Sequence, residues 1–547
     1  MNYRNFFDNK FSCNTLLVIL ISTVFFTSIQ NIAFWYKAFS LLSFRSLHDV
    51  LFALSLIIFL FCAINIIFSL LLYRITLKPL LVFFLIASAS VNYFSLNYGI
   101  YIDKAMITNI FETNTHEALA LLTPKLMLWV TVFGVIPSIF VWKIKLIKSD
   151  KLWTNLSLRI LNILISFVVL LCVALPLYKD YSSFIRNNSG IVKFITPTNY
   201  IAGSVNYFKQ LYNSNRPLIS IGLDAKQLKT AQNTKKSLLI IVVGETSRAQ
   251  NFSLNGYTKN TNPLLSKQDS LISFQNVQSC GTATAVSVPC MFSNMTRDNY
   301  SPSLAEHQEN LLDILKRANI DILWKENDAG CKGVCNRIPT ENIIDVTAKE
   351  FCPEGLCYDE NLLNNLDQYI NNRTKDTVIV LHTNGSHGPS YYQRYPKHIN
   401  SFKPSCDTNQ IQDCSEEALI NTYDNTILNV DYVLNQTIEL LKKHNDQFAT
   451  AMLYLSDHGE SLGESGLYLH GAPYSIAPKE QTHIPMIFWS SADFLNTRNM
   501  NQTCLRQNAQ QKPYSQDNLF HSVLGLLNVS TKEYDASLDL FKSCQSS

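Results

Sequence analysis

Long apolar runs fill the first third of this 547-residue sequence and constrain its fold more than any other feature. Five runs, at residues 13–35, 49–73, 79–98, 120–142 and 160–178, are each long enough to cross the roughly 30 Å hydrocarbon layer of a membrane. The first run lacks the small-residue cleavage site of a signal peptide, and further runs follow it. We therefore expect a transmembrane domain of five helices within residues 1–180.

The charges in the loops predict the orientation of these helices. The loop between the third and fourth runs is mixed in charge, with Asp103, Lys104, Glu112 and Glu117. The loop between the fourth and fifth runs is basic, with Lys143, Lys145, Lys148, Lys151 and Arg159. Because basic loops stay in the cytoplasm, an odd number of spans places everything after about residue 180 on the opposite side of the membrane.

The distribution of cysteine residues agrees with this topology. Three of the 13 cysteines lie in apolar runs, and ten lie in the second half of the chain: Cys280, Cys290, Cys331, Cys335, Cys352, Cys357, Cys406, Cys414, Cys504 and Cys544. An even number of cysteines, mostly close neighbours in sequence, is typical of short disulfide loops in an oxidising compartment. We expect neighbours to pair, and the longest loop, from Cys504 to Cys544, is the hardest to assign. Cys331 and Cys335 also have the spacing of zinc ligands, so that alternative stays open.

The remainder of the chain divides into a connector and a soluble domain. Residues 181–236 are polar and partly amphipathic, which is typical of a segment at the membrane surface. From residue 237 to 547, apolar runs of the buried-strand type (237–245, 321–327, 376–388, 448–460 and 483–491) alternate with helical patterns (304–319, 416–444 and 517–529). This alternation predicts an α/β domain whose largely parallel sheet is covered on both faces.

Ligand-type side chains follow three of the predicted strands. Glu245 follows the first strand, a segment from His382 to His387 follows the third, and Asp457 with His458 follows the fourth. In parallel sheets ligands bind at the carboxyl ends of strands, and carboxylate oxygen with imidazole nitrogen suits zinc. Each of these residues alone is more often a helix cap or loop residue, but together they favour a metal site. His470 lies twelve residues beyond His458 on a glycine-rich loop that can fold back over the strand ends.

Six motifs carry a resemblance to a known family: VVGETSR, SCGTATAVSVPCMFS, HTNGSHGPSYYQRYP, CDTNQIQDC, NTYDNTI and YLSDHGESLGE. In this order they resemble the lipid A phosphoethanolamine transferases of Gram-negative bacteria, including those that confer polymyxin (colistin) resistance, within the alkaline phosphatase superfamily. The resemblance covers the whole chain. It implies five transmembrane helices in the inner membrane followed by an alkaline phosphatase/sulfatase-like α/β/α domain in the periplasm.

The resemblance also implies a reaction and its substrates. Phosphoethanolamine would pass from phosphatidylethanolamine to a phosphate group of lipid A through a covalent phosphoethanolamine-threonine intermediate, lowering the negative charge of the envelope. We expect a monomer in the membrane whose partners are these two lipids, and no nucleic acid. The expected cofactor is one tightly bound zinc ion, with a second ion during turnover as an alternative.

The resemblance assigns roles to individual residues. Thr284 is the expected nucleophile, and the expected zinc ligands are Glu245, Thr284, Asp457 and His458. The other matched positions contact the transferred phosphoryl group, a second metal or the lipid head group: His387, His470, Lys332, Asp328, Asn109 and Glu112. Asp328 stands where some members have asparagine, which leaves its role open. Without the resemblance, the stretch from residue 278 to 290 leaves four candidate hydroxyls, on Ser279, Thr282, Thr284 and Ser287.

Three other functions remain as alternatives. The first is a phosphoethanolamine or phosphoglycerol transferase that acts on another envelope glycan. The second is a sulfatase-like hydrolase, which needs a Cys or Ser in a C/S-x-P-x-R context; here Pro289 and Cys290 stand in the wrong order, with no arginine nearby. The third is a non-catalytic membrane sensor that retains the fold, but a sensor would tolerate loss of the metal ligands, all of which are present.

Overall fold

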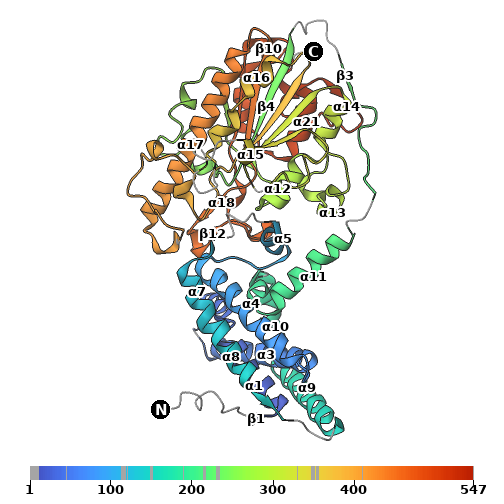
Figure 1. Cartoon of the computed structure of the whole chain (residues 1–547), viewed down its shortest axis with the longest axis vertical. Coiled ribbons are helices and arrows are strands. Elements are labelled where there is room, and N and C mark those ends of the chain that lie inside the picture. The colour runs from blue at the N-terminus through green and yellow to red at the C-terminus, as the bar shows by residue number, and fades with distance from the viewer. Residues whose placement is uncertain are drawn as a thin grey trace. The chain divides into compact units, whose positions relative to one another are not determined.

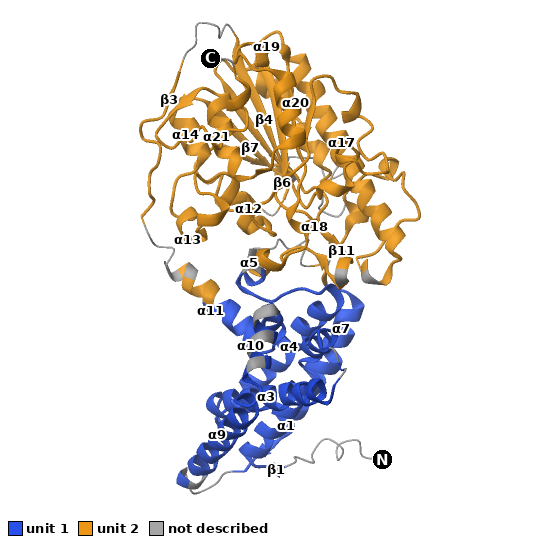
Figure 2. Ribbon diagram, turned by 180° about the vertical axis from the view of Figure 1, so that it is seen from behind, with its two compact units in different colours: residues 1–107, 122–205 blue, residues 108–121, 206–547 orange. Residues whose placement is uncertain are grey.

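The computed structural model describes residues 12–42, 44, 46–112, 119, 121–147, 152–188, 190–213, 217–228, 235–328, 330–346, 352, 357–409 and 411–545. The chain forms two compact units (Figure 2): residues 1–107 with 122–205, and residues 108–121 with 206–547. Of the charges used above to orient the helices, Glu117, Lys148 and Lys151 lie outside the described residues, and so does the side chain of Glu112.

Unit 1 is helical. Its helices are α1 (Thr15–Ser28), α2 (Ile32–Ser40), α3 (Leu47–Leu71), α4 (Leu77–Tyr98), α7 (Pro124–Val130), α8 (Ile136–Lys143), α9 (Leu152–Ala174), α10 (Tyr178–Asn187) and the first part of α11 (Thr198–Asn213), while α5 (Lys104–Glu112) runs across the boundary between the units. A single π-helical turn, Thr131–Val135, joins α7 to α8, and the short strands β1 (Ser12–Cys13) and β2 (Lys145–Leu146) pair in parallel.

The lengths of these helices agree with the predicted transmembrane domain. Among the described residues, four helical segments are long and apolar enough to span a membrane: Leu47–Leu71, Leu77–Tyr98, Pro124–Lys143 and Asn155–Ala174. The pair α1 and α2, bent by 46°, gives a fifth span if it is counted as one. A capping box of Ser46 and Asp49 begins α3, and Gly134 lets the π-helical turn approach α4, because a Cβ there would lie 3.1 Å from the Cα of Ile86.

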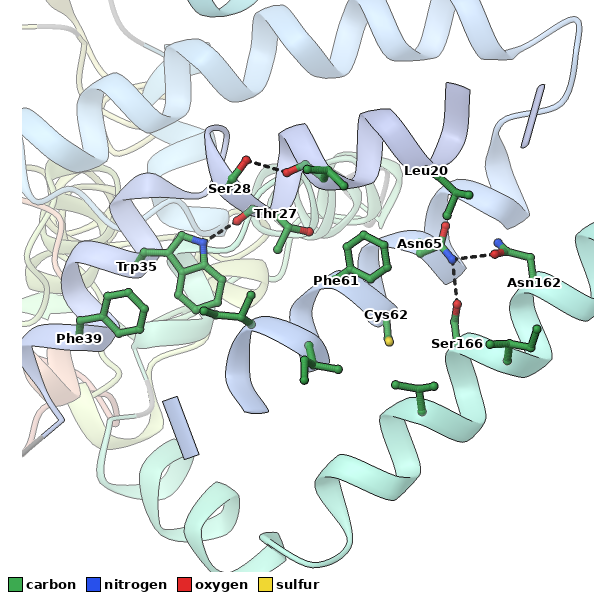
Figure 3. Close-up of a pocket in the computed structure, with 15 residues that line it drawn as sticks. Leu20, Thr27, Ser28, Trp35, Phe39, Phe61, Cys62, Asn65, Asn162 and Ser166 are labelled. Atoms are coloured by element: carbon green, nitrogen blue, oxygen red, sulfur yellow. Dashed lines mark hydrogen bonds between the residues drawn. The ribbon is translucent and has the colours of Figure 1, made fainter. Parts of the chain in front are cut away.

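Unit 1 also contains an apolar pocket of about 760 Å³ (Figure 3). Its polar wall is a small network in which Asn65 Nδ2 of α3 donates to Ser166 Oγ (2.8 Å) and to Asn162 Oδ1 (3.3 Å), both on α9. In hydrocarbon, hydrogen bonds of this kind hold helices together. The network therefore gives α3 and α9 a fixed contact in addition to apolar packing.

Unit 2 is built on a seven-stranded sheet with the order β5-β13-β10-β4-β9-β7-β8. The strands are β4 (Lys236–Gly244), β5 (Ile272–Phe274), β7 (Asp321–Glu326), β8 (Thr340–Asn342), β9 (Thr377–His382), β10 (Phe448–Ser456) and β13 (Met486–Ser490). Strands β10, β4, β9, β7 and β8 are parallel, as expected, whereas β13 and β5 run antiparallel at one edge. The other short strand pairs are β3 (Lys226–Gln227) with β15 (Val529–Ser530), β6 (Val277–Gln278) with β14 (Tyr514–Ser515), and β11 (Ser461–Leu462) with β12 (Tyr468–Leu469).

Helices cover both faces of this sheet (Figure 1). The helices of unit 2 are α12 (Thr284–Met291), α13 (Pro302–Ala305), α14 (Leu311–Arg317), α15 (Ile343–Val346), α16 (Leu366–Asn371), α17 (Glu416–Lys443), α18 (Lys479–Thr482), α19 (Ala492–Asn496), α20 (Gln502–Gln511) and α21 (Asp517–Leu526). The core on one face joins apolar residues of the sheet to α12, α14, α20 and α21, and α17 packs against the other face. The predicted α/β/α fold is therefore confirmed.

One predicted helix differs in its extent. The apolar pattern at 304–319 forms two helices, α13 and α14, in place of one. Asn310 interrupts the pattern because its side chain accepts from Leu312 N, while its own N–H donates to Asp313 in a capping box that begins α14.

Candidate active site

The strand register brings three predicted ligand positions to one edge of the sheet. Gly244 lies opposite Ser456, so the residues that follow them, Glu245 and Asp457, emerge side by side. On the other side of β4, Val243 pairs with His382, the last residue of β9. A register shift of one residue on either strand would turn these side chains to opposite faces.

Four side chains meet at this edge. The Thr284 hydroxyl lies 3.1 Å from Glu245 Oε2, to which it donates, and 3.3 Å from His458 Nε2. His458 Nε2 lies 3.2 Å from Asp457 Oδ2 and 3.6 Å from Glu245 Oε1. Glu245, Asp457 and His458 are fully buried, whereas Thr284 is half-buried and can be reached by a substrate.

The residues present fit a zinc ion. Glu245 Oε1 and Asp457 Oδ2 are buried and have no hydrogen-bond partner among the described residues, although buried carboxylate oxygens are ordinarily paired. His458 Nδ1 donates to Gly459 O at 2.9 Å, which leaves the lone pair of Nε2 facing the two carboxylates. Three oxygens and one imidazole nitrogen form the tetrahedral donor set that zinc takes.

The protonation states in the metal-free protein agree with this interpretation. Burial lowers the pKa of His458 to about 4, so the ring is neutral and able to bind a metal. Burial, together with the nearby Asp457 and Asp328, raises the pKa of Glu245 well above its ordinary value. A cation held between these carboxylates would remove the repulsion that produces this rise.

Local structure selects Thr284 from the four candidate hydroxyls. Ser279 Oγ donates to Gly281 O and Thr282 Oγ1 donates to Ala472 O, each at 2.6 Å, while Ser287 Oγ is buried without a partner in the described part of the chain. Thr284 is the first residue of α12, and the disulfide between Cys280 and Cys290 ties this loop to the helix. Its hydroxyl is the one of the four that reaches the carboxylates.

Two further histidines line the same site. The ring centroids of His458 and His470 are 4.5 Å apart, and those of His387 and His470 are 5.3 Å apart. His470 Nδ1 lies 3.3 Å from Glu460 Oε2, and the left-handed backbone of Leu469 (φ 64°) turns the loop toward the sheet. Burial and then the neighbouring His470 lower the pKa of His387 well below its usual range, so His387 is neutral.

A glycine allows the His387 loop to approach the cluster. Gly385 has φ of +50°, and a Cβ at this position would lie 2.5 Å from Glu245 O. Ser386 N donates to the same Glu245 oxygen. Any side chain at residue 385 would push His387 away from Glu245.

Comparisons with known proteins show the family of the chain. Residues 60–212 match the family model described as phosphoethanolamine transferase EptA/EptB, and residues 237–529 match the sulfatase model. The chain is 47% identical to phosphoethanolamine transferase EptA of Escherichia coli over 98% of both chains, and 36% identical to phosphatidylethanolamine transferase Mcr-1 of Escherichia coli over 88% of this chain and 90% of that one. The structure of the integral membrane lipooligosaccharide phosphoethanolamine transferase A from Neisseria meningitidis superposes with a TM-score of 0.95 at 38% identity, covering 98% of this chain and 100% of that one.

The chain belongs to the phosphoethanolamine transferase family. The resemblance drawn from the sequence is thereby confirmed, and the sheet of unit 2 is the sulfatase-like domain of this family.

The ten cysteines of unit 2 of this transferase form five disulfides. Neighbours in sequence pair throughout: Cys280–Cys290, Cys331–Cys335, Cys352–Cys357, Cys406–Cys414 and Cys504–Cys544. Cys331 and Cys335 are therefore bonded to each other, which excludes them as zinc ligands. Cys13, Cys62 and Cys172 in unit 1 are free thiols.

The remaining predicted contacts of the transferase lie on other segments of the chain. Lys332 has a left-handed backbone (φ 49°) between the disulfide-bonded Cys331 and Gly333, and its charge is one of those that lower the pKa of His387. Asp328 lies beside His382 rather than at the nucleophile, with 3.9 Å between Oδ2 and Nε2. Asn109 lies on α5, within residues 108–121, which group with unit 2.

Two site residues, Glu460 and Glu326, were not singled out by the sequence analysis, whereas His382 was named there at the end of its predicted strand. Glu460 is fully buried and contacts His470. The sequence feature that could have identified it is its position two residues after the predicted ligand His458. His382 and Glu326 end neighbouring strands and contact each other at 3.0 Å through Nδ1. Burial alone would lower the pKa of His382, but Glu326, Asp328 and Asp457 raise it to about 9. The contact between His382 and Glu326 could not be predicted from the sequence, because the two residues lie 56 positions apart.

Proposed function

We propose that this transferase moves phosphoethanolamine from phosphatidylethanolamine to a phosphate group of lipid A through a covalent intermediate on Thr284. The observation that carries the proposal is the position of the Thr284 hydroxyl, 3.1 Å from Glu245 and 3.3 Å from His458, inside a donor set that fits zinc. A threonine hydroxyl is a poor nucleophile until its alkoxide is stabilised. Bound zinc would supply the positive charge for that stabilisation.

In the first step, Thr284 Oγ1 forms a bond to phosphorus and the bond from phosphorus to the diacylglycerol oxygen breaks. The hydrogen bond from Thr284 to Glu245 Oε2 gives the hydroxyl proton an acceptor. The departing oxygen needs a proton, and we assign this role to His470, because its Nδ1 lies 3.3 Å from the buried carboxyl group of Glu460. His387 is neutral and is a poorer acid, so its role is to bind the phosphoryl group.

In the second step, a phosphate oxygen of lipid A attacks the same phosphorus and Thr284 Oγ1 leaves. The leaving oxygen recovers its proton from Glu245, and the attacking phosphate hydroxyl of lipid A gives its proton to His470, so the site returns to its starting state. Lys332 lies near His387 and would neutralise charge on the equatorial oxygens of phosphorus. The start of α12 at Thr284 adds backbone N–H groups that favour an anion at this point.

The proposed location is the inner membrane, with residues 1–180 as the transmembrane domain, residues 181–236 as the connector and residues 237–547 as the periplasmic catalytic domain. Five disulfides support an oxidising compartment, and the basic residues Lys143 and Lys145 support a cytoplasmic loop before α9. Asn109 and Glu112 on α5 are proposed to bind the lipid head group. Since the product carries an added amine, we propose that it binds polymyxins less strongly.

The test is lipid A analysis in a polymyxin-sensitive Gram-negative host that expresses the full chain. Mass spectrometry should detect phosphoethanolamine on lipid A with the parent and with the control Ser287→Ala, and none with Thr284→Ala. Ser287 lies on the same helix, and its buried hydroxyl makes no hydrogen bond in the described part of the chain. Modification by Thr284→Ala would exclude Thr284 as nucleophile, and modification of another glycan instead of lipid A would exclude the proposed acceptor.

A further inference from the structure

A second group of metal-binding side chains adjoins the first at the same sheet edge. One ligand atom each of Glu245, Asp328 and His382 lies within 4.8 Å of the other two. The three residues follow or end the strands β4, β7 and β9, so the parallel register holds them together. Glu245 belongs to both groups, since it has two carboxylate oxygens.

The ring of His382 is fixed so that one nitrogen faces this group. His382 Nδ1 donates to Glu326 Oε2 at 3.0 Å, and the same oxygen accepts from Trp324 Nε1 at 2.8 Å. Histidines that bind metals commonly donate their other nitrogen to a carboxylate in this way. His382 Nε2 is fully buried, has no hydrogen-bond partner among the described residues, and lies 3.9 Å from Asp328 Oδ2.

Four buried carboxylates gather at this edge, and one of them already pairs with His382. The side chains of Glu245, Asp457, Glu326 and Asp328 are 0%, 0%, 6% and 3% exposed, so four carboxylates share the site. Glu326 contacts His382 Nδ1 at 3.0 Å, whereas one oxygen each of Glu245 and Asp457 is buried without a hydrogen-bond partner among the described residues. A buried carboxylate without a neighbouring cation raises the free energy of the folded protein by roughly several kcal/mol.

We infer that Glu245, Asp328 and His382 bind a second divalent cation, of the zinc or manganese type, and that Glu245 is shared between the two ions. Two carboxylates and one imidazole are donors that both metals accept. The inference rests on the proposed active site but not on the reaction assigned to it.

The test is the metal content of the full chain, purified in detergent, stripped with chelator and then equilibrated with Zn²⁺ or with Mn²⁺. Elemental analysis should show one equivalent less for Asp328→Asn than for the parent, and also one less for His382→Gln. Asp321→Asn is the matched control, because Asp321 begins the same strand β7 and pairs with Arg373 at the opposite end. This control should keep the parent content.

The result that overturns the inference is a metal content of Asp328→Asn and His382→Gln equal to that of the parent. That outcome would mean that a protonated His382, rather than an ion, balances the carboxylates. Thermal unfolding of each variant shows that it remains folded. The measurement needs no lipid, so a protein that loses the second ion as expected yet never modifies lipid A would refute the proposed function and leave this inference standing.

Discussion

Buried polar groups at the two ends of the parallel sheet in unit 2 differ in their hydrogen bonding. At the amino end, Ser237 N donates to Asp376 Oδ1 at 2.6 Å, and Arg498 Nη2 donates to Ser237 Oγ at 2.8 Å. Arg498 also donates to Phe494 O and Leu526 O, so each of its three guanidinium nitrogens donates a hydrogen bond. At the carboxyl end, Glu245 Oε1, Asp457 Oδ2 and His382 Nε2 are buried without hydrogen-bond partners among the described residues.

This difference indicates that the amino end of the sheet contributes to stability and that the carboxyl end contributes to function. Satisfied polar groups at the amino end stabilise the fold, whereas unsatisfied ones at the carboxyl end raise the free energy of the metal-free protein. Groups of the second kind persist where a ligand completes them. Substitutions at the two ends should therefore have different consequences, which the following predictions use.

The largest effect is expected at the carboxyl end. Asp457→Asn removes one charge of the donor set, and we expect the transfer rate from phosphatidylethanolamine vesicles to lipid A to fall by about a thousandfold or more. The melting temperature of the metal-free protein should not fall, since the substitution removes repulsion with Glu245. A variant with a transfer rate within tenfold of the parent would contradict the assignment of Asp457.

An intermediate effect is expected at the amino end. Arg498→Met removes the donors to Leu526 O and Ser237 Oγ, and should lower the free energy of unfolding by about 3 kcal/mol. Transfer per folded molecule should remain that of the parent. Arg506→Met, on the exposed side of α20, is the control and should change stability by less than about 0.5 kcal/mol.

Denaturant titration of the full chain in detergent measures the free energy of unfolding of Arg498→Met and of Arg506→Met. If Arg498→Met abolished transfer while the protein remained folded, the proposed division between the two ends of the sheet would be wrong.

The smallest effect concerns the pH dependence of the metal-free protein. The pKa of Glu245 is raised above its ordinary value of 4.5 by burial and by the neighbouring Asp457 and Asp328. A carboxyl group with a raised pKa holds its proton more tightly in the folded protein. Its contribution to stability is complete below pH 4.5 and is lost as the pH rises through the raised pKa.

Melting temperatures of the chelator-treated full chain between pH 4.5 and 8 test this point, and Glu245→Gln should show a shallower decline than the parent. Adding Zn²⁺ should restore the parent at the upper end of this range but not the variant. Parallel profiles for the two proteins would show that Glu245 is not the group responsible.

Much of this arrangement was predictable from the sequence. An apolar run that is followed by Glu245 or Asp457 predicts where a buried strand ends, and the ends of parallel strands form the edge of the sheet. The same holds for the disulfides between close neighbours. The break between α13 and α14 was missed, since a capping box at Asn310 interrupts an apolar pattern that continues past it. The hydrogen bonds of this capping box decided where α14 begins, although the apolar periodicity continues across Asn310.

The choice of nucleophile was not predictable from spacing alone. Four hydroxyls lie within the stretch from residue 278 to 290, and what distinguishes Thr284 is contact with Glu245 and His458, which lie 39 and 174 residues away. The pairing of His382 with Glu326 is equally nonlocal. Only the folded sheet brings these groups together, so the resemblance to a family was needed to select Thr284 from the sequence.

The most direct test of the central claim is peptide mass spectrometry of the full chain after incubation with Zn²⁺ and phosphatidylethanolamine vesicles without lipid A. Without an acceptor, the covalent intermediate should accumulate. We predict one phosphoethanolamine group on Thr284 in the parent and in Ser287→Ala, and none in Thr284→Ala. An adduct on Ser279, Thr282 or Ser287, or transfer to lipid A by Thr284→Ala, would contradict the account.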